Sequence, residues 1–260
     1  MKFVKRKVMN RESHNQNIIR QFSQQAKEYT KIPSHSDGLD ELIKRSGVSK
    51  QDHVLDIACG SGLLSCAFAH HAQYVTGLDI TEQMLEEAKR LQSSQQLTNI
   101  NWIIGDVNDL PFPDQHFSMV MSRFGFHHFI NPQLVFEEMM RVCKPNGVVM
   151  VVDVALPHSK LDLYNVMEKN RDSSHVAALS VEALHDMFQS ASLSRIQHSH
   201  FIMTISLREQ LNASFPQDES ALKDMIIRDI GADKIGIEPV EINGEVYLNY
   251  PIHIFIGRKE

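Results

Sequence analysis

The sequence has little of what marks disulfide-stapled, secreted or membrane-spanning proteins. Its 260 residues include only 3 cysteines, without a Cys-x-x-Cys pair, which excludes a disulfide framework and a cysteine-rich zinc site. The most apolar run, Val148 to Leu156, is interrupted by Asp153 and is too short to cross a bilayer. Because an apolar segment near the N-terminus is also lacking, we expect a cytoplasmic protein without stable membrane insertion.

Excess positive charge and metal-binding spacings are absent as well. The net charge is −6, so we expect no nucleic-acid partner, and we interpret the basic cluster within residues 2–11 as a solvated leader. Among the 14 histidines, the pairs His70-His71 and His198-x-His200 have no acidic residue at a helpful spacing. Since His-Glu-x-x-His does not occur either, we predict no metal site.

Apolar periodicity predicts an α/β fold. Residues 15–46 show helical spacing interrupted by Pro33, and beyond Gly47 strand-like runs alternate with amphipathic helices. Strands are expected at 53–57, 74–79, 101–104, 117–122, 148–153, near 195–206 and at 250–257. Helices are expected at 62–71, 81–95, 132–142 and near 159–171, 180–191 and 218–230. This order predicts a doubly wound, mostly parallel, seven-stranded sheet with right-handed crossovers. We expect residues 1–46 to form a helical lid or leader and 47–260 the main domain, with a lid insertion around 157–180.

A turn of small residues, from Asp56 to Gly62, follows the first predicted strand and opens a helix. Small residues let a nucleotide-like ligand approach the backbone and the helix N-terminus closely. Asp79 ends the next strand, where its carboxylate can accept hydrogen bonds from a ribose diol. This spacing alone suits NAD as well as a methyl-donor nucleoside. The third glycine of the dinucleotide pattern Gly-x-Gly-x-x-Gly is replaced by Ser65, which disfavours NAD.

Further motifs follow in a fixed order. They are Asp56-x-Ala58-x-Gly60-x-Gly62, Gly105-Asp106-Val107, Leu110-Pro111-Phe112-Pro113 before Phe117-Ser118, and Lys144-Pro145-Asn146-Gly147. Together they resemble the motifs of class I S-adenosylmethionine (SAM) dependent methyltransferases of the menaquinone/ubiquinone-biosynthesis type. The resemblance covers roughly residues 18 to 195. Ala58, Ser118 and Asn146 depart from the residues most common in that family.

The resemblance implies SAM as cofactor and a role for each motif. Asp56, Gly60 and Gly62 would hold the methionine end, Asp79 the ribose, and Asp106 with Val107 the adenine. The cofactor residues implied in this way are Tyr29, Asp56, Ala58, Gly60, Ser61, Gly62, Asp79, Ile80, Met84, Gly105, Asp106, Val107, Ser122 and Arg123.

Candidate groups for the chemistry lie in three histidine-containing segments. Residues 122–129 resemble an Arg-(Phe/Tyr)-x-x-His-His-(Trp/Phe) segment of one branch of the family, which makes Phe124 a candidate substrate contact. If the acceptor is a hydroxyl or an acidic carbon, histidine is the usual base near neutral pH. His127 and His128 are both candidates, but adjacent side chains point in different directions, so we expect at most one to face the substrate.

The other two segments are open to a second interpretation. Arg171 to His175 resembles an Arg-Asp-Pro-Ser-His segment of the same branch, so Arg171 is a candidate substrate ligand and His175 a candidate base or ligand. The alternative is a helix C-terminus with its capping turn. His35 is either a lid residue near the substrate or an exposed side chain, and we expect Phe22 to be a core residue.

The sequence therefore predicts a SAM-dependent methyltransferase that modifies an oxygen or carbon of a small, aromatic or quinone-like acceptor. A homodimer is possible. Two other functions stay open: a nicotinamide-dependent reductase and a catalytically silent SAM-binding module.

Overall fold

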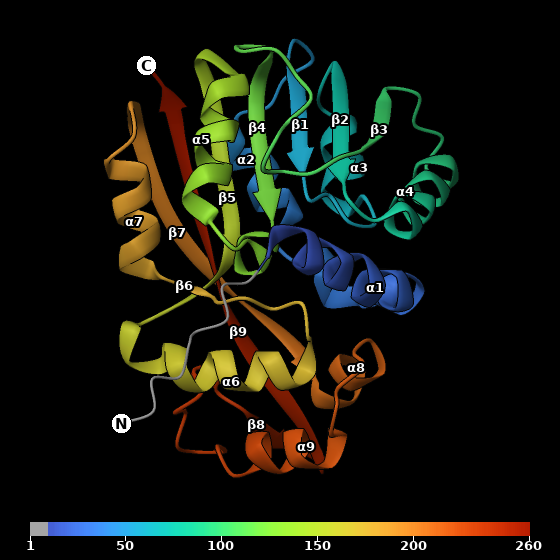
Figure 1. Ribbon diagram of the computed structural model, residues 1–260, viewed down its shortest axis with the longest axis vertical. Helices are drawn as coiled ribbons and strands as arrows, with labels where there is room; N and C mark the ends of the chain where they lie inside the picture. Colours follow the sequence, from blue (N-terminus) through green and yellow to red (C-terminus); the bar gives the residue numbers. More distant parts are fainter. Residues whose placement is uncertain (1–9) are drawn as a thin grey trace.

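A mixed sheet organises the chain. In the computed structural model, which describes residues 10–260, the main path of strands runs in the order β3-β2-β1-β4-β5-β9-β7 (Figure 1). These strands are β1 His53–Ile57, β2 Tyr74–Asp79, β3 Ile100–Ile104, β4 Phe117–Arg123, β5 Cys143–Leu156, β7 Leu193–Ser206 and β9 Glu245–Lys259. Strands β1 to β5 are parallel, whereas β9 runs antiparallel to both of its neighbours. The predicted doubly wound, mostly parallel sheet is confirmed. Two short strands, β6 Leu179–Ser180 and β8 Val240–Ile242, add to it at β5 and β9.

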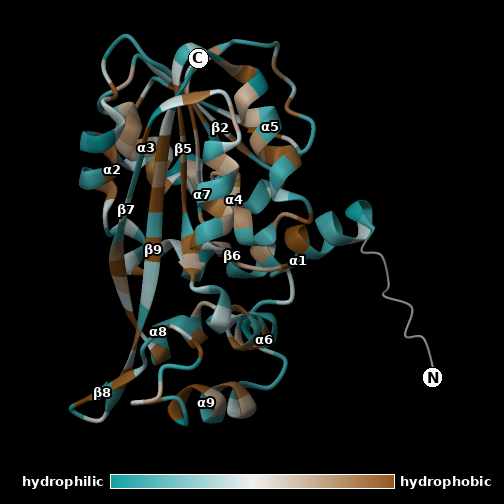
Figure 2. Ribbon diagram, turned by 90° about the vertical axis from the view of Figure 1, so that its left-hand side faces the viewer, coloured by the Kyte–Doolittle hydropathy of each residue, from teal (hydrophilic) through white to brown (hydrophobic). Residues whose placement is uncertain are grey.

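Helices cover both faces of this sheet. α2 Leu39–Ser46 and α3 Leu63–Ala69 lie on one side, and α5 Pro132–Val142 lies on the other with α7 Val181–Gln189 (Figure 2). Along β5, Val149 and Val151 join one apolar core while Met150 and Val152 join the other. The continuous apolar run of this strand follows from that two-sided burial.

A polar segment at the start of β5 produces a difference from prediction. Residues Lys144 to Gly147, expected to be a turn, belong to β5 and lie at a break in its register with β4, where Phe117 pairs with Cys143 and Met119 with Val148. Asn146 has a φ of 62°, the left-handed conformation that the expected turn also requires. The left-handed residue of the expected turn is therefore present, but it lies inside the strand, where it forms a β-bulge.

The strands β7 and β9 run well beyond the parallel strands. Figure 2 shows this pair descending to β8, where it packs with α8 Leu207–Asn212 and lies near α9 Glu219–Ile227. α6 Leu161–Arg171, which falls in the predicted lid insertion, packs against α9. These elements form a lower layer beneath the carboxyl ends of β1, β2 and β4 (Figure 1).

The remaining helices complete the nucleotide side of the fold. α1 Arg11–Thr30 crosses below the carboxyl ends of β1 and β2 and packs against α4 Glu82–Ser94 (Figure 1). The first nine residues, with most of the basic cluster, lie outside the described residues, and the division at residue 46 stays a prediction. None of the helices within residues 10–260 combines the length and the apolar character needed to cross a bilayer.

Candidate functional site

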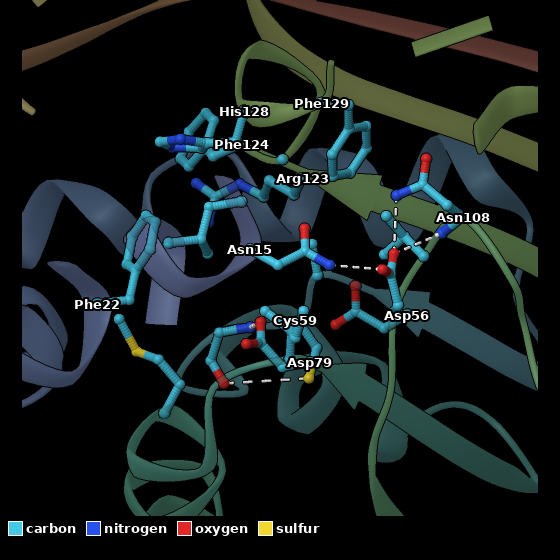
Figure 3. A pocket seen from close by; sticks show the side chains of 18 of the residues that line it. Asn15, Phe22, Asp56, Cys59, Asp79, Asn108, Arg123, Phe124, His128 and Phe129 are labelled. Atoms are coloured by element: carbon cyan, nitrogen blue, oxygen red, sulfur yellow. Dashed lines mark hydrogen bonds between the residues drawn. The ribbon is translucent and has the colours of Figure 1, made fainter. Parts of the chain in front are cut away.

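Two adjoining cavities lie at the carboxyl ends of the parallel strands and are covered by α1. The larger has a volume of about 290 Å³ and the smaller about 70 Å³. Five side chains line both of them: Phe22, Tyr29, His35, Phe124 and His128. Carboxyl ends of parallel strands are where this class of sheet binds ligands. Figure 3 shows the larger cavity, with Phe22 and His128 on one side and Asp56 and Asp79 on the other.

The turn of small residues forms one wall of the larger cavity. Ala58, Gly60 and Gly62 have φ values of 51°, 52° and 77°, so all three are left-handed. A Cβ atom on Gly60 would meet nothing within 4 Å, because Gly60 borders open space. A Cβ on Gly62 would lie 2.6 Å from the Trp102 ring. Gly60 therefore leaves room for a ligand, whereas Gly62 permits close packing behind the wall.

Asp79 fixes this turn to the end of β2. It is 8% exposed, and its two carboxylate oxygens accept hydrogen bonds from the backbone N–H groups of Gly60 and Thr81, both at 2.8 Å. Burial raises the pKa of this carboxyl above its ordinary value. Because each oxygen has a second acceptor position, the carboxylate can still bind both hydroxyls of a diol.

Asp56 lies beside it as a second buried acid. Its side chain accepts a hydrogen bond from the Ser65 hydroxyl at 2.6 Å and is 1% exposed as a residue. Burial raises the pKa of Asp56 to about 7. A cationic ligand group would favour its charged form.

Arg123, at the end of β4, is a buried cation that faces the larger cavity. Its Nη1 and Nη2 donate to the backbone carbonyls of His35 and Asp37 at 2.6 and 3.0 Å. Its Nε has no hydrogen-bond partner among residues 10–260, and burial lowers its pKa to about 10. The guanidinium lies 4.2 Å from the centre of the Phe124 ring, and Phe124 itself has a φ of 59°. A bulky residue in the left-handed region stores strain, and such strain is frequent at functional sites.

Asp106 connects the end of β3 to helix α1. One carboxylate oxygen accepts from the backbone and side-chain nitrogens of Asn108 at 2.9 and 2.7 Å. The other accepts from Arg11 Nε at 3.0 Å and Asn15 Nδ2 at 2.6 Å. Burial alone would raise the pKa of Asp106, but these hydrogen bonds hold it below its ordinary value. The start of α1 thus closes one end of the larger cavity.

The smaller cavity contains a histidine–carboxylate dyad. His127 Nδ1 lies 2.6 Å from Oδ1 of Asp153, which also accepts from the backbone N–H of Val154 at 2.7 Å. The other oxygen of Asp153 accepts from the backbone N–H of Phe126 at 2.8 Å, so the carboxylate is firmly oriented. Burial opposes a charge on His127, yet Asp153 raises its pKa above the ordinary value. When Nδ1–H donates to Asp153, the neutral imidazole keeps a lone pair at Nε2.

The two other candidate bases lie differently. His128 lines both cavities, its Nδ1 lies 3.1 Å from the carbonyl of Ser174, and burial together with His127 lowers its pKa to about 4. His175 lines neither cavity; its Nε2 lies 2.8 Å from Asn165 Oδ1, and burial lowers its pKa far below the ordinary value. His175 therefore lies outside both cavities, with its ring centre 5.6 Å from that of His127, and its role as base or ligand stays a prediction.

The structure brings most predicted cofactor residues to the larger cavity. These are Tyr29, Asp56, Ala58, Gly60, Ser61, Asp79, Ile80, Met84, Asp106, Val107 and Arg123. Gly62, Gly105 and Ser122 do not line it. A Cβ on Gly105 would lie 2.8 Å from Leu78, so Gly105 permits close packing there. The Ser122 hydroxyl is buried without a partner among the described residues, and its predicted role stays a prediction. Of the predicted substrate contacts, His35 and Phe124 line both cavities and Arg171 lines the smaller.

Several residues that line the two cavities were not predicted from the sequence. Phe22, expected in the core, lines both cavities because its face of α1 covers the site. The missed residues of the larger cavity include Arg11, His14, Asn15, Cys59, Asn108 and Phe129. Those of the smaller cavity include Asp153, Tyr164, Glu168, Gln210 and Tyr250. Only Asp153 had a local signal, since it interrupts an otherwise apolar strand. Within residues 10–260, histidine, cysteine and acidic side chains form no group of three or more suited to a metal ion.

Comparisons with known proteins agree with this geometry. Residues 55–151 match the family model described as a methyltransferase domain. The chain is 30% identical over 176 residues to the uncharacterized methyltransferase YcgJ of Bacillus subtilis, covering 66% of this chain and 70% of that protein. It is 35% identical over 121 residues to the demethylmenaquinone methyltransferase of Listeria monocytogenes serotype 4a, covering 45% of this chain and 51% of that enzyme. The chain thus spans about half the length of that relative.

A solved structure supports the fold over most of the chain. The crystal structure of the Bacillus subtilis YcgJ protein superposes with a TM-score of 0.77 at 25% identity. The match covers 87% of this chain and 98% of that one.

Proposed function

This chain belongs to the class I SAM-dependent methyltransferase family, and we propose that it methylates an oxygen or an acidic carbon of a small, aromatic or quinone-like molecule. The observation that carries the proposal is the junction of the two cavities. The larger suits the nucleoside and methionine parts of SAM, and the smaller, which holds the His127–Asp153 dyad, suits the acceptor. Relatives that act on demethylmenaquinone support an acceptor of this kind.

The residues of the larger cavity fit SAM. Asp79 keeps two acceptor positions for a ribose diol, and Gly60 leaves open space beside it. Asp56 suits the ammonium of the methionine end, while the Arg123 guanidinium, which lines the same cavity, suits its carboxylate. When bound, SAM supplies a methyl group on a sulfonium, already activated for in-line displacement.

Asp106 is proposed to contact the adenine amino group, with Val107 packing on the ring. Both of its oxygens are already engaged by Asn108, Arg11 and Asn15. A carboxylate has about four acceptor positions, so the adenine contact requires Arg11 or Asn15 to give way. One of these side chains at the start of α1 therefore has to rotate away from Asp106 when the cofactor enters.

The acceptor side needs a group that removes a proton. His127 Nε2 is that base in our proposal, and Asp153 holds the imidazole in the tautomer that leaves Nε2 free. A positioned base of this kind contributes about 10²–10⁴-fold to rate. The five side chains common to both cavities exclude water and align the acceptor, which supplies much of the remaining acceleration.

Transfer of radiolabelled methyl groups from SAM tests the proposal. The protein is incubated with phenols, quinols and β-dicarbonyls, and the label is expected in hydroxyl or acidic-carbon products. His127→Asn should abolish transfer while retaining S-adenosylhomocysteine (SAH) binding, whereas the same change at the exposed His70 should leave both transfer and SAH binding unchanged. Binding of SAH without transfer to any acceptor would instead indicate a silent SAM-binding module. Binding of NADH without SAH would indicate a reductase.

A further inference from the structure

The lower end of the smaller cavity contains polar side chains that the protein leaves without partners. Tyr164 on α6 and Gln210 on α8 line this end and are 2% and 9% exposed. Neither the Tyr164 hydroxyl nor the Gln210 side-chain amide forms a hydrogen bond with another residue of the described part of the chain. Their polar atoms are not fully enclosed by the protein, so they open onto the cavity, where they can form hydrogen bonds with a polar group of a ligand.

Arg171, also on α6, lines the same cavity and has N–H groups that are not all engaged in hydrogen bonds. Its Nε and Nη2 lie 2.8 and 2.6 Å from Oε2 of Glu168, and its Nη1 lies 3.2 Å from the Ser214 hydroxyl. These contacts use at most three of the five N–H groups of a guanidinium. The other oxygen of Glu168 accepts from the Tyr250 hydroxyl at 3.2 Å, which fixes the ion pair in position.

The charges around this end decide what kind of group it accepts. Arg171 is already neutralised by Glu168, whose residue is 2% exposed. Asp172 and Asp153 are buried nearby at 1% and 2% exposure. A carboxylate from a ligand would be the fourth anion in this region, and like charges in a poorly solvated site repel strongly. An ammonium group has no lone pair, so it cannot accept hydrogen bonds from the open N–H donors of Arg171.

Volume limits how much of the acceptor this end holds. An apolar cavity of about 150 Å³ accommodates benzene, whereas the smaller cavity measures about 70 Å³. A ring therefore has to extend into the space between Phe22, Tyr29 and Phe124, which line both cavities. The lower end holds only the functional group at one edge of that ring.

We propose that the methyl acceptor carries, opposite the methylated position, an uncharged carbonyl or hydroxyl oxygen that Arg171, Gln210 and Tyr164 bind. This inference rests on the proposed function and specifies its substrate class. The guanidinium N–H groups and the Gln210 amide donate to the oxygen, and the Tyr164 hydroxyl donates to it or accepts from a hydroxyl. These side chains determine specificity, and the proton transfer stays with His127.

Four para-substituted phenols test the inference. They are 4-hydroxyacetophenone with a carbonyl, 4-ethylphenol as its apolar counterpart, 4-hydroxybenzoate with a carboxylate and tyramine with an ammonium. Dissociation constants for the SAH-saturated protein are measured by calorimetry, and methyl transfer from labelled SAM is measured alongside. We expect the ketone to bind at least about tenfold more tightly than the other three, the effect of one ordinary hydrogen bond.

Matched variants connect the preference to the named side chains. Gln210→Leu and Tyr164→Phe should each reduce the preference for the ketone over 4-ethylphenol while leaving the SAH-induced thermal shift intact. The same changes at exposed positions, Gln133→Leu and Tyr74→Phe, should leave the preference unchanged.

Three outcomes would overturn the inference: equal binding of ketone and ethylphenol, tightest binding of the carboxylate or the ammonium, or no binding of any of the four. An unchanged preference in both cavity variants would do the same. All of these leave the proposed function standing as long as SAH binds and a methyl group is transferred. Loss of SAH binding and of all transfer would instead contradict the proposed function itself.

Discussion

Cofactor affinity should depend on pH through Asp56. In the free protein this carboxyl is buried against Ser65, and burial raises its pKa to about 7. The proposed neighbour in the complex is the cationic ammonium of the methionine end, which favours the ionised carboxylate. Below pH 7, binding must therefore expel a proton from Asp56. Affinity for SAH should fall by up to about tenfold per pH unit below pH 7 and level off above it.

The size of this effect follows from the pKa. Relative to the plateau above pH 7, the expected loss at pH 5.5 is about 30-fold in Kd, or about 2 kcal/mol at 1.36 kcal/mol per pH unit. The stability of the ligand-free protein depends on pH in the opposite direction. Because the pKa of Asp56 is higher in the folded state than in the unfolded chain, this group destabilises the fold increasingly as pH rises from about 4 to 7. The SAH-induced rise in Tm should consequently be larger at pH 8 than at pH 6.

Isothermal titration calorimetry with SAH over this pH range measures the dependence. Asp56→Asn keeps the shape of the side chain but cannot ionise, so its affinity should be lower above pH 7 and nearly independent of pH. The Asp56→Asn variant is needed to assign the pH dependence of SAH affinity to Asp56, because burial also raises the pKa of Asp79. A wild-type affinity that does not change with pH, or an Asp56→Asn protein with the wild-type slope, would refute the assignment.

Three further changes have definite expected results. Asp153→Asn removes the acceptor for His127 Nδ1–H and should lower the rate of methyl transfer by about 10²–10⁴-fold in steady-state assays with SAH affinity preserved; an unaltered rate would count against the dyad. Ala58→Gly relieves a left-handed φ of 51° and should stabilise the protein by about 1 kcal/mol in chemical denaturation, whereas a lower midpoint would contradict that strain. Arg11→Ala breaks a partly exposed ion pair to Asp106, so stability should change by less than about 1 kcal/mol while stopped-flow association of SAH accelerates. An unchanged association rate would mean that α1 does not restrict entry.

The parallel half of the fold could be predicted because β1, β2, β4 and β5 are buried on both faces over most of their length. β1 and β2 have the expected bounds, since apolar runs in such strands end where the ligand-binding turns begin. β7, predicted near 195–206, lies at Leu193–Ser206, so only the lower half of β9 was harder to recognise. β9 begins at Glu245 rather than near Tyr250, because most of its first residues are only partly buried and they show no continuous apolar run.

The residues of the candidate site likewise include some that sequence patterns locate and some that they do not. Gly60, Asp79 and Asp106 belong to local motifs whose geometry follows from a strand and the turn after it, so sequence patterns locate them. The helical period of α1 shows that Phe22 faces inward but not whether it meets a core or a cavity. Tyr164 and Gln210 come from separate elements of the lower layer, and only the packing of α6 and α8 beside β9 brings them together.

Calorimetric titration with SAH and with NADH tests the SAM assignment most directly. The wild-type protein should bind SAH and not NADH. Asp79→Ala should stay folded and lose SAH binding, because the ribose loses a charged acceptor worth about 1.5–3 kcal/mol per hydrogen bond. Binding of NADH, binding of neither ligand, or tight SAH binding by the Asp79→Ala protein would contradict the assignment of the larger cavity.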